Sequence, residues 1–543
     1  MKSKVQKIII LIALIIFFTA LTINPSELNA SEDFNKINTS DTNILIFGIR
    51  FNPSNIDPHV TWNPNDYHAI DQVVEGLFAY NLSHPQMSLI PQLAEDFGLW
   101  TENNYTVNIR QGVTFHDGTP LDANAVKWNF DRLAYFMENY LAQARDLYEY
   151  YDVSDGLYKP IINRTEVIDT YTIKFILNKV VGHFETLLSF YGSYILSPSS
   201  ASATEPIDTE TGDLVGTGPF MYDNYVPNVE VTFHRNENYW AGLANITDLK
   251  FSIFNNTTTL NNALLSGDVD LIVDILPSML DTFIADPNVI LESTPGMAIN
   301  YLGMNNYWIN ASFRKAISYA IDYDFILNEL REGQAVRLKS LLPGSMLYAN
   351  SSYNVATYDV EIARETMQSM GYGLGWTVTP GGPDEANWRS ATFATFNYTY
   401  FIGNSLYTDI YSLLYDNLEA IGIRVIDGGM TWSDFIYRLY NIGGLHRNML
   451  QMFWLSWIPD FNDPHAIINY HINNRPNTNN LVNLNDPIVQ TWIENAIFTS
   501  NQTLRSILYN KIQQRLVEEL YPWAFGFVNL EYVAYRSDIS GFQ

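Results

Sequence analysis

The sequence has no cysteine in 543 residues. Disulfides, thiolate catalysis and cysteine-based zinc sites are therefore excluded. Basic residues are also scarce, because 30 lysines and arginines stand against 58 acidic residues and give a net charge of −28. Phosphate backbones and anionic lipids repel so acidic a chain, so we expect no nucleic-acid partner.

Charged residues make up only 16% of the chain and hydrophobic residues 47%. This balance is typical of a globular protein and not of a disordered one. A chain of 543 residues exceeds one ordinary hydrophobic core, so we expect two or three domains.

Long apolar runs are absent except at the N-terminus. Three lysines within the first seven residues precede the run Ile8–Ile23, which is shorter than the ~20 residues that span a bilayer. We expect residues 1–30 to be a signal peptide cleaved after Ala30, and residues 31–42 to be a polar tether. The alternative is that the apolar run is retained as a membrane anchor.

The stretch Tyr105–Phe130 combines three local signals. Apolar residues alternate from Tyr105 to Ile109, which predicts a half-buried strand. Asp117-Gly118 has the composition of a tight turn, and Asp122 is placed to cap a helix with apolar residues at helical spacing. His116 beside Asp117 could indicate acid–base chemistry, but the turn accounts for Asp117.

These residues resemble the signature of the peptide-binding (family 5) class of extracellular solute-binding proteins of ABC importers. The resemblance extends from about Asn43 to the end of the chain. Further matching motifs are Asp57-Pro58-His59, Gly216-Thr217-Gly218-Pro219-Phe220, Asn238-Tyr239-Trp240, Asp268-Val269-Asp270-Leu271 and Arg314-Lys315-Ala316. The apolar stripe from Phe313 to Ile321 predicts a helix that turns Arg314 and Lys315 away from the core.

The resemblance implies an α/β, bilobal periplasmic-binding-protein-like fold of the large three-domain type, with a hinged interlobe cleft. It implies lobe I in residues 43–82 and 196–300, with a family-specific extra domain in 83–195. Lobe II then covers residues 301–523, and residues 524–543 return to lobe I.

The segment Trp454–His465 resembles the ligand-binding segment of the family's peptide binders. The resemblance implies that Asp460 accepts the α-ammonium group of a peptide, that Trp457 contacts the ligand, and that the preceding segment pairs with the ligand backbone. Trp62 is a further candidate ligand contact. The alternative interpretation is that Asp460 is a turn residue and Trp457 a core residue.

Other chemistries have no support in the sequence. The chain contains no His-Glu-x-x-His zinc motif, no Gly-x-Ser-x-Gly nucleophile elbow and no Lys-Ser/Thr after its glycine-rich loop. We therefore expect a monomeric binding protein with no catalytic residues, no cofactor and no metal, which delivers peptides to an ABC permease. The alternatives are a binder of oligosaccharides and a membrane-anchored sensory receptor.

Overall fold

The computed structural model describes residues 43–440, 450–475 and 480–539. The expected signal peptide and tether therefore lie outside the described residues. The chain divides into two compact units. Unit 1 contains the chain up to Thr294 together with the residues from Glu531 onward, and unit 2 is Pro295–Leu530. The chain passes from one unit to the other inside two long strands, β14 (Val289–Met304) and β19 (Trp523–Arg536).

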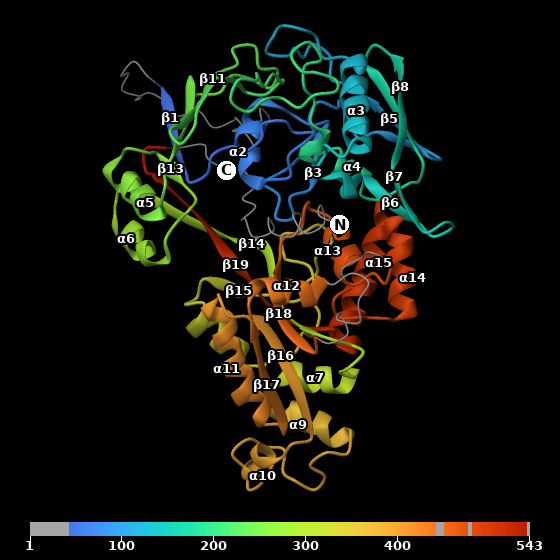
Figure 1. Cartoon of the computed structure of the whole chain (residues 1–543), viewed down its shortest axis with the longest axis vertical. Helices are drawn as coiled ribbons and strands as arrows, with labels where there is room; N and C mark the ends of the chain where they lie inside the picture. The colour runs from blue at the N-terminus through green and yellow to red at the C-terminus, as the bar shows by residue number, and fades with distance from the viewer. Residues whose placement is uncertain (1–42, 441–449, 476–479, 540–543) are drawn as a thin grey trace, which may run out of the picture. The chain divides into compact units, whose positions relative to one another are not determined.

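Unit 1 is built around a mixed sheet (Figure 1). Its strands, in order across the sheet, are β10 (Phe220–Val226), β11 (Glu230–Arg235), β12 (Asp248–Ile253), β1 (Ile44–Ile49), β13 (Leu271–Ile272) and the end of β19. β1 pairs in parallel with both β12 and β13, so it lies in the middle of the sheet. The apolar content of Ile44–Ile49 predicts a strand, and the structure confirms it.

Helix α5 (Thr257–Ser266) follows β12 and packs its apolar face against this sheet. Asn256 begins the helix by accepting a hydrogen bond from the Thr259 amide at 2.8 Å. Gly267 ends it with φ +81°, a left-handed conformation that glycine adopts without strain. The apolar face of Leu260, Ala263 and Leu264 followed by Gly267 predicts a helix that stops at this glycine, and the structure confirms it.

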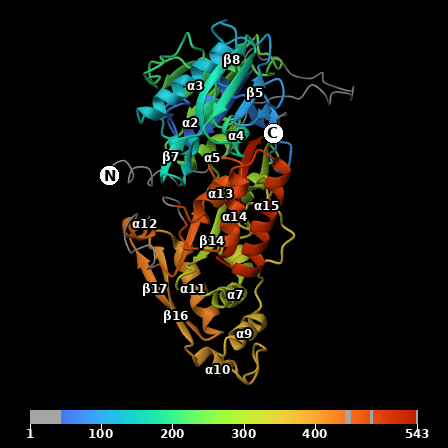
Figure 2. The same cartoon turned by 90° about the vertical axis from the view of Figure 1, so that its right-hand side faces the viewer.

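A second sheet in unit 1 carries the signature stretch. Its strands, in order, are β4 (Leu99–Thr101), β5 (Asn104–Asn108), β9 (Thr172–Leu177) and β8 (Ile162–Asp169). Helix α3 (Ala123–Glu138) lies against this sheet (Figure 2). Asp122 caps α3 by accepting hydrogen bonds from the Asn124 and Ala125 amides at 2.9 Å, so the predicted strand, cap and helix are confirmed.

Smaller elements complete unit 1. They are α2 (Pro64–Val73), β2 (Phe78–Tyr80), β3 (Leu89–Pro91), η1 (Arg145–Tyr148), β6 (Glu149–Asp152), β7 (Leu157–Pro160), α4 (Phe184–Leu187), η2 (Tyr191–Ser193), η3 (Pro277–Met279) and α6 (Leu280–Ala285). β2 pairs with β3, and β6 pairs with β7.

The sequence from Tyr67 to Phe78 has a helix-like pattern, but helix α2 ends at Val73, five residues before Phe78. The glycine-rich loop explains part of this boundary, because a Cβ on Gly216 would lie 2.1 Å from the Val73 carbonyl oxygen. A Cβ on Gly218 would lie 2.7 Å from the Gln72 carbonyl oxygen. The loop is therefore glycine-rich because its backbone approaches the end of α2 closely, and Phe78 belongs instead to β2.

Unit 2 contains a mixed set of strands that belong to the same hydrogen-bonded sheet. Its strands, in order, are β14, β18 (Met452–Trp457), β16 (Ala394–Phe401) and β17 (Ile423–Met430), and the short β15 (Ala335–Arg337) pairs with β19. β14 and β18 are antiparallel, whereas β16 is parallel to both β17 and β18. A large apolar core surrounds this sheet and includes Leu302, Tyr398 and Trp454.

The helices of unit 2 cover the sheet and extend beyond it. They are α7 (Ala311–Ala320), α8 (Tyr323–Phe325), η4 (Ile326–Leu330), α9 (Val360–Ser369), α10 (Glu385–Ser390), α11 (Ser405–Glu419), α12 (Trp432–Tyr440), α13 (His465–His471), α14 (Pro487–Ile497), α15 (Gln502–Arg515) and η6 (Leu516–Leu520). α11 lies beside β17, and α14 packs along α15 (Figures 1 and 2).

The prediction that Arg314 turns away from the core is wrong. Arg314 is only 4% exposed, although the helix that carries it forms where the apolar stripe placed it. Its guanidinium donates to backbone carbonyls, among them Leu520 at 2.6 Å and Ile309 at 2.5 Å. The helical stripe failed to predict this because a long side chain can reach buried carbonyl groups from the margin of an apolar face.

Candidate functional site

The predicted binding segment lies between a strand and a helix of unit 2. β18 ends at Trp457, the chain turns through Asp460, and α13 begins at His465. Asp463 Oδ1 accepts a hydrogen bond from the His465 amide at 2.9 Å. It also forms an ion pair with Arg505 Nη2 at 2.8 Å. Both charged side chains are buried, so the turn that carries Asp460 is fixed to α15 by a buried salt bridge.

This ion pair also determines the protonation state of Arg505. Burial alone lowers the pKa of Arg505, but the adjacent Asp463 charge outweighs burial and holds that pKa above its usual range. Arg505 therefore stays charged, and Asp463 Oδ1 is occupied by the turn and by Arg505, whereas its buried Oδ2 has no hydrogen-bond partner among the described residues.

The backbone of β18 has an open edge close to Asp460. β14 pairs with the whole of β18, whereas β16 pairs with it only as far as Phe453. The Met304 amide donates to the Pro522 carbonyl at 3.1 Å, so the even-numbered residues of β14 turn their amides away from β18. By this alternation the amide and carbonyl of Ser456 face the other edge, where no strand among residues 43–440, 450–475 and 480–539 pairs with them.

Aromatic side chains gather around Trp457, on β18, the strands on its paired side and α13. Tyr301 stacks on Trp523 with ring centroids 3.8 Å apart, and the His471 ring lies 4.4 Å from Trp457 and 5.8 Å from Trp523. The Tyr301 hydroxyl lies 3.4 Å from His471 Nδ1. We call these four residues the aromatic cluster.

The aromatic cluster contains polar atoms that the described protein leaves unsatisfied. The indole Nε1 atoms of Trp457 and Trp523 and Nε2 of His471 are buried and have no hydrogen-bond partner among the described residues. Burial lowers the pKa of His471 to about 3, so the ring is neutral at physiological pH. A buried donor without a partner costs about 1–3 kcal/mol, which a bound ligand with acceptor atoms would recover.

The structure places the three predicted site residues in different settings. Asp460 is half-buried in the turn after β18, and Trp457 is buried in the aromatic cluster. Trp62 is half-buried in unit 1, next to Asn63, which caps α2. Their roles as ligand contacts stay predictions.

Sequence reasoning missed three members of the aromatic cluster: Tyr301, His471 and Trp523. Each comes from a different element, so no spacing along the chain brings them together. The only available signal was an aromatic residue on each of two strands expected to cross between lobes.

Within the residues that the structure describes, no group of three or more histidine and acidic side chains could hold a metal ion. The same residues include no helix that is long and apolar enough to span a membrane.

Comparison with known proteins identifies the class to which this architecture belongs. The family of bacterial extracellular solute-binding proteins, family 5 (middle part), matches residues 88–479. The chain is 24% identical to the heme-binding protein A of Haemophilus influenzae over 525 residues, which is 92% of this chain and 89% of that protein. It is 26% identical to the dipeptide-binding protein of Escherichia coli over 342 residues, which is 60% of this chain and 62% of that protein. The structure of HbpA2 from Haemophilus parasuis superposes with a TM-score of 0.74 at 22% identity and covers 91% of this chain and 96% of that one.

The chain belongs to the family 5 extracellular solute-binding proteins. It is therefore a substrate-binding component of an ABC import system with the periplasmic-binding-protein fold, as the sequence predicted. Proteins of this family bind substrates and do not transform them, in agreement with the expectation that the chain is not an enzyme.

Proposed function

We propose that the protein captures peptides, and that the open edge of β18 at Ser456 binds their backbone. An extended peptide can add a strand to an exposed sheet edge, where main-chain hydrogen bonds give affinity for many sequences. Ser456 offers one amide and one carbonyl in the orientation that such a strand needs. The 26% identity to a dipeptide-binding protein supports the same assignment.

Asp460 is the group that we assign to the peptide's α-ammonium. It follows the open edge by four residues, and the buried Asp463–Arg505 pair holds its turn in place. A half-buried carboxylate forms a short, charge-assisted hydrogen bond with an ammonium group. Pro459 has no amide, so the strand interaction ends just before the carboxylate.

The second candidate ligand is an oligosaccharide, and the aromatic cluster is the observation that favours it. Trp457 and Trp523 combine ring surfaces with indole donors that have no partner among the described residues. Sugar rings can pack on aromatic faces while their hydroxyl groups accept such hydrogen bonds.

The test is calorimetric titration of wild type, Asp460→Asn and Trp457→Ala with a peptide and with an oligosaccharide that raise the melting temperature in a ligand screen. For a peptide, Asp460→Asn removes one partner of a buried charge pair and costs about 2–5 kcal/mol, or roughly thirtyfold or more in affinity. N-acetylation of the peptide should weaken wild-type binding equally, and the two changes should not add because they remove one interaction.

An oligosaccharide predicts the opposite order. Asp460→Asn would then reduce the binding free energy by only about 0.5–1.5 kcal/mol, the contribution of an ordinary hydrogen bond. Trp457→Ala would cause the larger loss of affinity. Unchanged affinity in both variants would exclude this segment as the binding site.

A further inference from the structure

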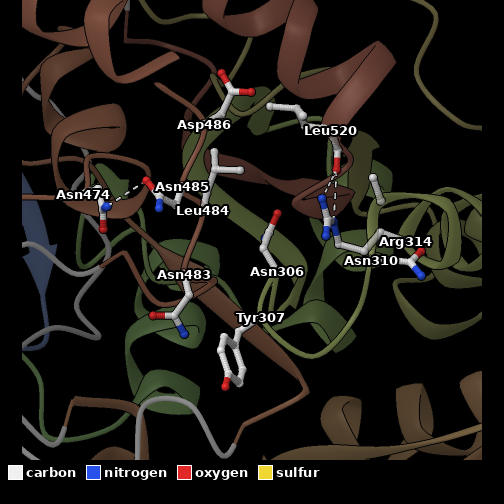
Figure 3. A pocket seen from close by; sticks show the side chains of 11 residues that line it. Asn306, Tyr307, Asn310, Arg314, Asn474, Asn483, Leu484, Asn485, Asp486 and Leu520 are labelled. Atoms are coloured by element: carbon white, nitrogen blue, oxygen red, sulfur yellow. Dashed lines mark hydrogen bonds between the residues drawn. The ribbon is translucent and has the colours of Figure 1, made fainter. Parts of the chain in front are cut away.

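A polar pocket lies in unit 2, apart from the residues of the candidate binding segment. Its volume is about 540 Å³, and Asp460, Trp457 and Trp62 do not line it. Four stretches of chain meet there: the residues around the start of α7, Asn474 after α13, the segment that leads into α14, and Leu520 at the end of η6 (Figure 3). Five of the lining residues are asparagines: Asn306, Asn310, Asn474, Asn483 and Asn485.

Arg314 gives this pocket a buried positive charge. All its protein hydrogen-bond partners are backbone carbonyls: Leu520 at 2.6 and 3.0 Å, Tyr521 at 3.0 Å and Ile309 at 2.5 Å. Figure 3 shows the guanidinium reaching the Leu520 carbonyl. No carboxylate among the described residues pairs with it, and burial lowers its pKa to about 10.

The carbonyl groups offset this charge only in part. The Leu520 and Tyr521 carbonyls belong to the C-terminal end of η6, where the helix dipole supplies a fraction of a negative charge, whereas Ile309 precedes α7. A guanidinium has five N–H groups, and Nε, Nη1 and Nη2 each donate to these carbonyls, which leaves two N–H groups of Arg314 for another acceptor. The contrast is Arg505, whose charge in the same unit meets the full charge of Asp463.

Two helix N-termini open onto the pocket. Asn310 caps α7, and Asp486 caps α14, so both helices direct the positive ends of their dipoles toward the lining. The only acidic residue in the lining is already neutralised, because Asp486 Oδ2 pairs with Arg515 Nη2 at 2.7 Å and its Oδ1 accepts the Val489 amide at 2.9 Å.

The amides add hydrogen-bond donors. Asn483 Nδ2 is buried and has no hydrogen-bond partner in the described part of the chain. Asn474 Nδ2 donates to Asn485 Oδ1 at 3.2 Å, which fixes these two side chains together at the rim (Figure 3). A buried donor and an unbalanced cation that line the same pocket are groups that an oxygen-bearing anion satisfies.

We propose that this pocket is a binding site for a small oxyanion, a carboxylate or a phosphate group, held by Arg314, the Asn483 amide and the N-terminus of α7. The volume exceeds that of a bare ion, so the group belongs to a small organic molecule or is accompanied by water. The site is additional to peptide capture and does not depend on it.

Charge placed at the helix cap tests the site without removing Arg314. Asn310→Asp keeps the cap, because aspartate caps helices as well as asparagine, and adds a negative charge at the pocket. Asn501→Asp is the matched control: Asn501 caps α15 through the same type of bond, to the Leu504 amide at 3.0 Å, and does not line the pocket.

The full chain is titrated calorimetrically with inorganic phosphate and with citrate at about 0.15 M salt, which screens the long-range repulsion from the net charge of −28. Asn310→Asp should weaken binding about tenfold, and Asn501→Asp should leave it unchanged. Binding of phosphate alone would assign a phosphate site, and binding of citrate alone a carboxylate site.

A crystal grown with selenate shows where the oxyanion binds. An anomalous peak within hydrogen-bond distance of Arg314 in the wild type, lost in Asn310→Asp, is the expected result. Absence of binding by both anions, or equal weakening in the two cap variants, would overturn the proposal. Peptide affinity should stay unchanged in Asn310→Asp, so this test can fail independently of the Asp460 assignment.

Discussion

Several buried polar groups of the two units differ in how far the described protein satisfies them, although unit 1 also contains unsatisfied atoms such as Trp100 Nε1. In unit 1, the buried Glu75 has no cation beside it, yet its carboxylate accepts four side-chain hydrogen bonds: from Gln92 at 3.0 Å, Thr217 at 2.7 Å, Tyr239 at 2.8 Å and Trp240 at 2.9 Å. Asp57 forms a fully buried ion pair with Arg132 at 2.5 Å. In unit 2, three ring nitrogens of the aromatic cluster have no partner among the described residues, and no carboxylate of that part of the chain pairs with Arg314.

This difference separates structural polar groups from functional ones. A buried group that the protein satisfies contributes to the fold, whereas a group left unsatisfied costs stability unless something else binds to it. The family motif residues of unit 1, Asp57 and Trp240 among them, therefore belong to the scaffold. Among the unsatisfied groups of unit 2, those of the aromatic cluster lie next to the candidate binding segment, and Asn483 Nδ2 lies in the proposed oxyanion pocket.

The largest expected effect comes from breaking the scaffold of unit 1. Burial raises the pKa of Asp57, but the hydrogen bond and charge of Arg132 outweigh burial and lower it below its ordinary value. Arg132→Met leaves this carboxylate buried and unpaired, which should cost about 3–5 kcal/mol of unfolding free energy. Chemical denaturation measures the loss, and Asp57→Asn combined with Arg132→Met should recover part of it. A loss below about 1 kcal/mol would show that the pair is not structural.

A pair of identical substitutions tests the comparison directly. Trp240→Phe removes a donor from buried Glu75 and should cost about 1–3 kcal/mol beyond the packing loss. Trp457→Phe removes the same atoms but leaves no described protein group without its partner. Its loss of unfolding free energy should therefore be smaller than that of Trp240→Phe by about 1–3 kcal/mol. Thermal unfolding of both variants gives the difference, and equal costs would contradict the assignment. Ligand affinity should fall only in Trp457→Phe.

A smaller effect concerns pH. Burial raises the pKa of Asp71 to about 8, although Tyr194 donates a hydrogen bond to it at 2.9 Å. The folded protein then holds a proton that the unfolded chain releases near its ordinary pKa of about 3.9. Stability from this group is therefore present below about pH 4 and is lost as pH rises toward 8.

Asp71→Asn should remove the contribution of this group to the pH dependence of the unfolding free energy. The decrease of that free energy between pH 5 and 7 should become shallower by about 1 kcal/mol per pH unit. Denaturation at several pH values measures the slope for both proteins. Parallel slopes would mean that Asp71 is not protonated in the folded state.

Local patterns predicted most of the framework. The alternation at Tyr105–Ile109, the Asp122 cap and the Gly267 stop each depend on neighbours in the chain, and the structure contains all three. The end of α2 could not be predicted in this way, because it depends on Gly216, which approaches from a distant part of the sequence.

The same limit applies to the candidate site. Asp460 and Trp457 could be named because they lie in one motif, whereas His471 and Trp523 join them only through tertiary packing. The burial of Arg314 was mispredicted because its partners, the Leu520 and Tyr521 carbonyls, lie about two hundred residues away along the chain.

Amide hydrogen exchange at Ser456 tests the central claim most directly. In the free protein this amide faces the open edge of β18 and should exchange rapidly, while the amide of Leu455, in the ladder with β14, is protected. A saturating peptide should slow exchange at Ser456 by roughly tenfold or more, because the added strand accepts its hydrogen bond. Exchange at Ser456 that is unchanged by a peptide of established affinity would contradict strand addition at this edge.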